Sequence, residues 1–166
     1  LEDSWNSSLS TEDKNKLKGA MVSAVDLLKG IAVGASMKVL QVEGANGGLH
    51  TNYTGKAKAA VDAVLNDGYD FAYIHVEAPD EMGHQGSMER KIQAVENLDE
   101  RVIKRLTDAL YAKNVDFRLL VLPDHPTPIR VRTHTADNVP YLLFDSTDIK
   151  ENEWKYNEKD AMSSGV

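Results

Sequence analysis

Two Asp and three His residues lie in segments that follow predicted strands, and their side chains could bind a metal ion. Asp80 and His84 are four residues apart, so a helical turn would place both on one face. Asp124 and His125 are adjacent in a proline-rich turn, and His134 joins them if the chain folds back. Carboxylate and imidazole ligands without thiolates suit Mn²⁺, Zn²⁺ or a related divalent ion. The pattern therefore predicts a metal site.

Each of these residues also has an ordinary structural interpretation. Asp80 and Asp124 are of the type that caps helices and forms turns. A single His in a loop is commonly a surface or hydrogen-bonded residue. We favour the metal hypothesis because three unrelated turns would not be expected to carry these residues together at strand ends.

Other polar residues have weaker claims to a function. His75 lies inside an apolar segment and is expected in the core or behind a ligand, and His50 is expected at the surface. Segment 48–56 resembles a phosphate-binding P-loop, but its glycine spacing breaks the required pattern. The glycine-rich segment 44–48 could offer N–H groups to an anion, although a tight connection between elements is the simpler interpretation.

The elements that must position these residues alternate along the chain. Apolar segments predict strands, and amphipathic segments predict helices; the strands are 20–23, 37–42, 69–76, 117–122 and 139–144, and the helices are 25–33, 53–65, 87–111 and 158–162, with a further helix start at 10–13. This alternation predicts an α/β fold with a mostly parallel sheet flanked by helices. The loops after 69–76 and 117–122 would then emerge at one edge of the sheet.

The long helix 87–111 is expected to bury one apolar stripe and to carry a Glu100–Lys104 ion pair on its exposed side. The stripe comprises Met88, Ile92, Val95, Leu98, Val102, Leu106 and Ala109.

Composition narrows the function classes. The chain has 166 residues and 18.3 kDa, the size of one domain, and we treat 1–166 as one unit. It has no Cys, which excludes disulfides, thiolate metal sites and a Cys nucleophile, and which fits a reducing compartment such as the cytoplasm. The formal charge of −7 disfavours nucleic acid as a partner. No apolar run is long enough to predict a membrane helix.

Three motifs carry a family resemblance. Segments 80–86, 122–128 and 132–140 together resemble cofactor-independent phosphoglycerate mutases of the archaeal type, which belong to the alkaline phosphatase superfamily. The similarity extends from about residue 18 to about residue 166. It implies an alkaline-phosphatase-like core.

The resemblance also implies an activity and its cofactors. Such enzymes interconvert 3-phosphoglycerate and 2-phosphoglycerate through a phosphoserine, with two divalent ions, Mn²⁺ or Zn²⁺, and with Mg²⁺ or Co²⁺ as alternatives. By this resemblance Asp80, His84 and His134 hold one ion, and Asp124 and His125 contribute to the second. The partner would be a small phosphorylated substrate, phosphoglycerate.

The chain departs from the family pattern in one large respect. The nucleophilic Ser, an Asp near the amino terminus and the substrate-clamping domain have no match. Ser23, Ser87 and Thr127 lie near the relevant segments, but none matches the nucleophile, and a structural role is expected for each. We therefore expect the truncated carboxyl-terminal part of a phosphatase-like domain, inactive alone. The alternatives are a homoserine kinase-like phosphotransferase or phosphonopyruvate decarboxylase of the same branch, and a non-catalytic metal-binding module.

Overall fold

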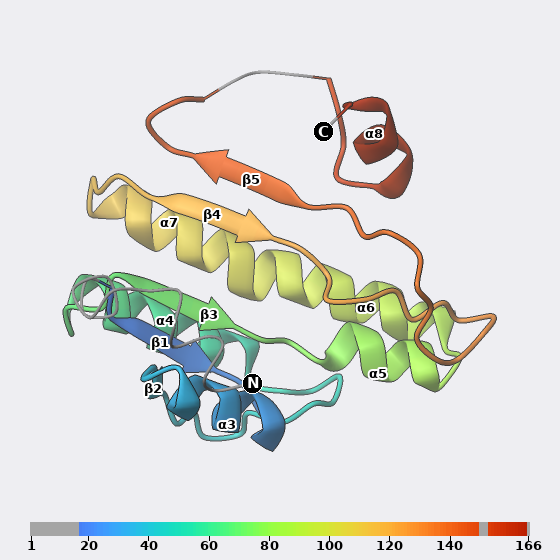
Figure 1. Ribbon diagram of the computed structural model, residues 1–166, viewed down its shortest axis with the longest axis horizontal. Helices are drawn as coiled ribbons and strands as arrows, with labels where there is room; N and C mark the ends of the chain where they lie inside the picture. The colour runs from blue at the N-terminus through green and yellow to red at the C-terminus, as the bar shows by residue number, and fades with distance from the viewer. Residues whose placement is uncertain (1–16, 150–152, 166) are drawn as a thin grey trace.

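Strands and helices alternate along the first half of the chain and build a parallel sheet (Figure 1). The computed structural model describes residues 17–149 and 153–165, so the predicted helix start at 10–13 lies outside the described residues. The sheet has the order β2-β1-β3. Its elements, with the helices between them, are β1 (Gly19–Val22), α3 (Asp26–Gly34), β2 (Lys38–Val39), α4 (Tyr53–Leu65) and β3 (Phe71–Ile74).

Helix α4 has the bounds that the sequence predicts, and its local signals explain why. The side chain of Asn52 accepts a hydrogen bond from the Gly55 N–H and so caps the first turn. Tyr53 and Ala57 of this helix lie in the apolar core cluster, whose members also include Leu49, Ala78, Met82, Ala94 and Val102. The helix therefore joins the sheet to the elements that follow.

A nearly continuous helical rod follows β3 (Figure 1). The short helix α5 (Ala78–His84) comes first and packs beside this rod, whose parts are α6 (Met88–Leu98), the π-helical turn η1 (Asp99–Ile103) and α7 (Lys104–Ala112). Because a π turn places residue i+5 one turn ahead, it rotates Lys104 away from Glu100. The predicted Glu100–Lys104 pair is therefore wrong, and Lys104 Nζ lies 2.8 Å from Asp108 Oδ2 instead.

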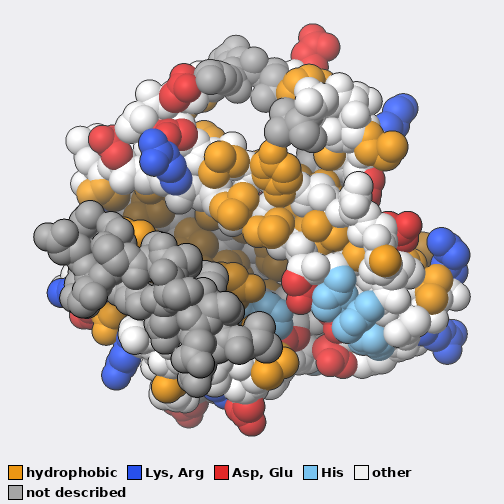
Figure 2. Space-filling view, viewed as in Figure 1, with side chains coloured by type: hydrophobic (Ala, Val, Ile, Leu, Met, Phe, Trp, Pro, Cys, Tyr) orange, Lys and Arg blue, Asp and Glu red, His pale blue; other side chains and the backbone are white. Residues whose placement is uncertain are grey.

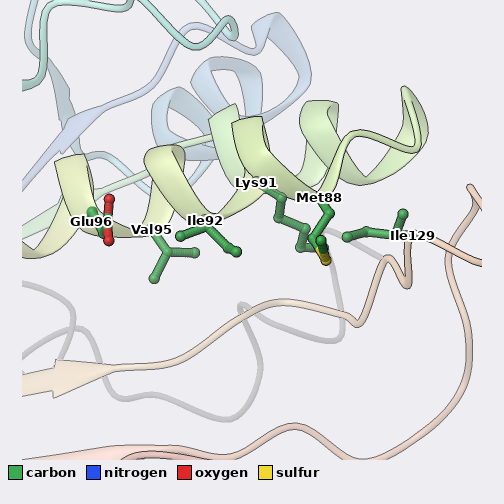
Figure 3. Close-up of a pocket in the computed structure, with 6 residues that line it drawn as sticks. All are labelled: Met88, Lys91, Ile92, Val95, Glu96 and Ile129. Atoms are coloured by element: carbon green, nitrogen blue, oxygen red, sulfur yellow. The ribbon is translucent and has the colours of Figure 1, made fainter.

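The predicted apolar stripe is buried only in part. Val102 is buried, but Met88, Ile92 and Val95 are more than half exposed, so their assignment to the core is wrong. Helix α6 uses a different face, that of Ala94, against the core. The exposed face forms an apolar groove of about 310 Å³, lined by Met88, Lys91, Ile92, Val95, Glu96 and Ile129 (Figure 3).

The last strands form a separate antiparallel pair. β4 (Arg118–Val121) pairs with β5 (Leu142–Asp145), and α8 (Glu158–Ser163) follows. The sequence predicts mostly parallel strands, which holds for the first sheet but not for this pair. Parallel neighbours need a crossover segment, usually a helix, and the chain between β4 and β5 has none.

Strand β3 is less buried than its apolar sequence suggests. Phe71 is 41% exposed and Tyr73 is 42% exposed, because β3 is an edge strand in its sheet. β3 and β4 run in the same direction (Figure 1). Apolar side chains line the hollow between the parallel sheet and the β4–β5 pair (Figure 2). Among the described residues, no helix is long and apolar enough to cross a membrane.

Candidate metal centre

Helix α5 brings Asp80 and His84 together at the end of β3. Pro79 occupies its first turn, where a missing N–H costs no hydrogen bond. The four-residue spacing puts Asp80 Oδ2 3.3 Å from His84 Nε2. The prediction that one helical turn places both on one face is confirmed.

The loop after β4 carries the remaining candidates back onto α5. Arg132 has a left-handed backbone conformation, with φ of 59°, which reverses the chain before His134. The Arg132 carbonyl oxygen lies 2.9 Å from His84 Nδ1. Since a carbonyl only accepts, His84 donates from Nδ1, and in the neutral tautomer that makes this contact the free electron pair is on Nε2.

Asp80, His84 and His134 form a compact triangle of donor atoms. His84 Nε2 lies 3.1 Å from His134 Nε2, and the two nitrogens lie 3.3 Å from different Asp80 oxygens, His84 from Oδ2 and His134 from Oδ1. A tetrahedral ion about 2.0–2.1 Å from each ligand would hold them roughly 3.3 Å apart. The residues present therefore fit a divalent ion in spacing and in donor type.

His125 and Asp124 lie next to this triangle, because His125 contacts Asp80 on one side and Asp124 on the other. His125 Nε2 lies 3.3 Å from Asp80 Oδ1, and His125 Nδ1 lies 3.3 Å from Asp124 Oδ1. Figure 2 shows His side chains gathered with acidic side chains on one side of the molecule. All five predicted ligands thus lie in one connected cluster, although only Asp80, His84 and His134 form the compact triangle.

The carboxyl group of Asp80 is the centre of this cluster. Its Oδ1 also accepts a hydrogen bond from the Thr127 hydroxyl. Partial burial alone would raise the pKa of Asp80, but the Thr127 hydrogen bond and the neighbouring His side chains outweigh burial and lower it. Asp80 is therefore a carboxylate at neutral pH, the form that binds metal.

Lys91 ties α6 to the same loop. Its Nζ donates to the Thr127 carbonyl oxygen at 2.6 Å. Burial lowers the pKa of Lys91, whereas the charge of Asp80 opposes that shift. The carbonyl and the hydroxyl of Thr127 are thus both hydrogen-bonded, to Lys91 and to Asp80.

A second polar cluster lies behind the first and includes two residues that sequence reasoning missed. Lys56 is fully buried and Glu77 is 6% exposed, and Lys56 Nζ lies 2.7 Å from Glu77 Oε2. Glu77 also contacts His75 and the buried Ser23. The helical spacing of the sequence indicates that Lys56 is buried, because it shares the buried face of α4 with Tyr53 and Ala60.

The other candidates are placed as follows. His75 follows the last residue of β3, is 18% exposed and faces the cluster through Asp124. His50 is exposed, as expected. Ser87 occupies the N-cap position of α6.

Comparison with known proteins identifies relatives of this chain. The sequence model of one family, described as the metalloenzyme superfamily, matches residues 2–163. The 2,3-bisphosphoglycerate-independent phosphoglycerate mutase of Methanosarcina acetivorans is 44% identical over 89% of this chain. The protein of the same name from Methanosarcina mazei is 52% identical over 76% of this chain. The chain spans about a third of these relatives, 36% and 32% of their respective lengths.

A solved structure has the same fold. The PH0037 protein from Pyrococcus horikoshii superposes with a TM-score of 0.80 and 34% identity. The match covers 92% of this chain and 44% of that one. The α/β architecture predicted from the sequence is thus confirmed.

Proposed function

The chain belongs to the metalloenzyme superfamily, and we propose that it is the metal-binding part of an archaeal-type phosphoglycerate mutase. It is homologous to these enzymes over about a third of their length. The proposed parent activity is the interconversion of 3-phosphoglycerate and 2-phosphoglycerate. The relatives' names supply phosphoglycerate as the substrate, and we propose the cytoplasm as the location of the parent enzyme.

The observation that carries the proposal is the triangle of Asp80, His84 and His134. The Nε2 atoms of its two His residues are 3.1 Å apart, and each lies 3.3 Å from one of the two Asp80 oxygens. The Nδ1 atom of His84 faces away from the triangle, toward the Arg132 carbonyl oxygen. We propose that this triangle holds one divalent ion, Mn²⁺ or Zn²⁺, and that Asp124 and His125 contribute to a second.

Two such ions supply positive charge that binds a phosphoryl group and stabilises the attacking and leaving oxygens. This chain's own residues would then position the ions and leave the remaining coordination sites open to the substrate. The cluster lies at the surface, with His134 half exposed, so a phosphate group has access to it.

The nucleophilic hydroxyl is proposed to come from a part of the mutase that has no match in this chain. Ser23 is buried, and the Thr127 hydroxyl donates to Asp80, so neither is placed as a nucleophile. The isolated chain is therefore expected to bind metal without turning over 3-phosphoglycerate.

A calorimetric titration with Mn²⁺ and with Zn²⁺ tests the metal site. Asp80→Ala and His134→Ala are expected to abolish binding at the first site and to leave the fold intact, since both residues lie near the surface. Asp67→Ala, at an exposed turn, is the matched control and should bind normally. Equal affinity in all of these proteins would contradict the ligand assignment.

A chimera tests the activity. The matching third of the Methanosarcina acetivorans enzyme is replaced by this chain, and mutase turnover is measured with the Asp80→Ala chimera beside it. We expect turnover from the first chimera only. A folded, metal-binding chimera without turnover would favour the non-catalytic module instead.

A further inference from the structure

We propose that Thr127 is a positioning residue of the metal centre, whose hydroxyl holds the Asp80 carboxylate in the orientation that binds the first ion. Lys91 would hold Thr127 in place from helix α6. This inference rests on the proposed function, because Asp80 is a ligand of the proposed first ion. Sequence reasoning expects only a structural role for Thr127 and gives Lys91 no role at the centre.

The first step concerns the Thr127 side chain, which is buried against the cluster. Only 4% of Thr127 is exposed, and its hydroxyl donates to Asp80 Oδ1. A hydroxyl has a single proton, so this proton is committed to the carboxylate. Hydrogen bonds to an ionised acceptor are stronger than those between neutral groups. The contact therefore restricts the rotation of the Asp80 carboxylate.

The second step concerns the orientation of this carboxylate. Asp80 Oδ2 lies 3.3 Å from His84 Nε2, and Asp80 Oδ1 lies 3.3 Å from His134 Nε2. Each oxygen thus faces one imidazole nitrogen of the triangle. A partial rotation of the carboxylate would move both oxygens away from these positions. Because Thr127 holds Oδ1, it preserves the arrangement of donor atoms that the ion needs.

The third step concerns what fixes Thr127 itself. Lys91 Nζ donates to the Thr127 carbonyl oxygen at 2.6 Å. Gly83 of α5 leaves room for both groups, since a Cβ atom there would lie 2.5 Å from the Thr127 carbonyl oxygen and 2.9 Å from Lys91 Nζ. The close approach of the loop to α5 therefore needs glycine at this position. Thr127 is held between α5 and α6.

The loop around Thr127 carries this restraint to His134. Thr127 lies between two prolines, whose rings each fix a backbone torsion angle. The carbonyl oxygen of the first, Pro126, accepts a hydrogen bond from the Thr135 N–H at 3.1 Å. Thr135 follows His134 directly, so the backbone next to this ligand is joined to the backbone next to Thr127. Thr127 therefore connects α5 to the returning loop that carries His134.

Calorimetric titration of the whole chain with Zn²⁺ tests this role. Thr127→Val keeps the shape of the side chain but removes its hydroxyl, and it should weaken binding of the first ion by about 10–100-fold. Thr127→Ser keeps the hydroxyl and should retain most of the affinity. A residue that only packed against its neighbours would give the opposite order, because Val keeps the bulk that Ser loses.

A second variant tests the support of Thr127 from α6. Lys91→Met removes the donor to the Thr127 carbonyl oxygen and keeps the apolar part of the side chain. It should weaken binding of the first ion, though by less than Thr127→Val does. Urea denaturation of each metal-free variant checks that it folds.

Thr107→Val is the matched control for the loss of a hydroxyl. Thr107 is also partly buried, and its hydroxyl donates to the Ile103 carbonyl oxygen at 3.1 Å. It lies on α7, at the end of the helical rod that is remote from α5 (Figure 1). Thr107→Val should therefore leave the Zn²⁺ affinity unchanged.

The outcomes separate this inference from the proposed function. Zn²⁺ affinity that falls in Asp80→Ala but not in Thr127→Val would overturn the role of Thr127 and leave the proposed function standing. Equal losses in Thr127→Val and Thr127→Ser would overturn that role too, as would unchanged affinity in Lys91→Met where Thr127→Val does not fold. Absence of Zn²⁺ binding by the unaltered chain would overturn both proposals.

Discussion

At the scale of single residues, the centre depends on groups that orient ligands as much as on the ligands themselves. The Arg132 carbonyl sets the proton of His84, and it can do so because Arg132 adopts a left-handed conformation. Gly86 faces the Arg132 guanidinium and has a φ of +69°. The spacing of the Asp and His residues does not reveal either backbone conformation, although both help to position the ligands.

Gly86→Ala tests this arrangement. A side chain there would be strained by the positive φ and would press on the Arg132 guanidinium, so we expect a loss of about 1–2 kcal/mol in the free energy of unfolding. Urea denaturation measures this change. Gly30→Ala, within α3 and with open space around it, is the control and should stabilise the protein by about 0.5–1 kcal/mol. Equal effects would contradict the prediction.

Acid stability tests the buried Glu77. Its pKa is 4.5 in the unfolded chain and about 2 in the folded protein, so its contribution is full above pH 4.5 and is lost as the pH falls toward 2. We expect Glu77 to account for a fall on the order of 3 kcal/mol in the free energy of unfolding across this range. Urea denaturation of the metal-free protein at several pH values measures it. The Lys56→Met, Glu77→Gln double variant should show a smaller slope, and an unchanged slope would refute the assignment.

At the scale of elements, periodicity predicts the helices well and their burial poorly. Helix α4 has its predicted bounds because its cap and its Ala-rich face are both local signals. The stripe on α6 has the same spacing as a core stripe, but nothing local tells which of two apolar faces meets the core. Ala94, a small residue, allows the close contact that Ile92 does not make.

A pair of Ala substitutions tests this distribution of burial. Val102→Ala removes a buried side chain and should cost about 1–2 kcal/mol of unfolding free energy. Ile92→Ala removes a larger but half-exposed side chain and should change it by less than about 0.5 kcal/mol. Chemical denaturation of both variants decides the matter. A larger loss of unfolding free energy for Ile92→Ala than for Val102→Ala would contradict this distribution and support a buried stripe.

At the scale of the whole molecule, the direction of the strands was only partly predictable. Alternating strands and helices correctly predict the parallel sheet around β1, because each crossover contains a helix. Between β4 and β5 the chain has no helix, and Pro-rich loop residues return it in the opposite direction. The ligand positions do not depend on this difference, because the ligands lie on α5, which follows β3, and on the loop that follows β4.

Within the described residues, β3 and β4 each have an edge without a strand partner. Such edges, with exposed apolar residues such as Leu120, pair readily with other chains. We expect the chain to associate increasingly with concentration in sedimentation velocity. Leu120→Lys should reduce the association, and Met162→Lys, on the exposed face of α8, should not. Concentration-independent sedimentation of the parent chain would contradict this expectation.

Three hydrogen bonds between protein groups join the loop after β4 to α5 and α6. They run from Lys91 to the Thr127 carbonyl, from Thr127 to Asp80 and from His84 to the Arg132 carbonyl. Contacts between protein groups therefore hold the ligand loop against both helices. A chelator should withdraw the metal and leave the fold in place, and a different metal should be able to take the vacated position within minutes rather than after refolding. Metal identity in the cell would then follow from supply, with the protein selecting only among ions of suitable size and charge.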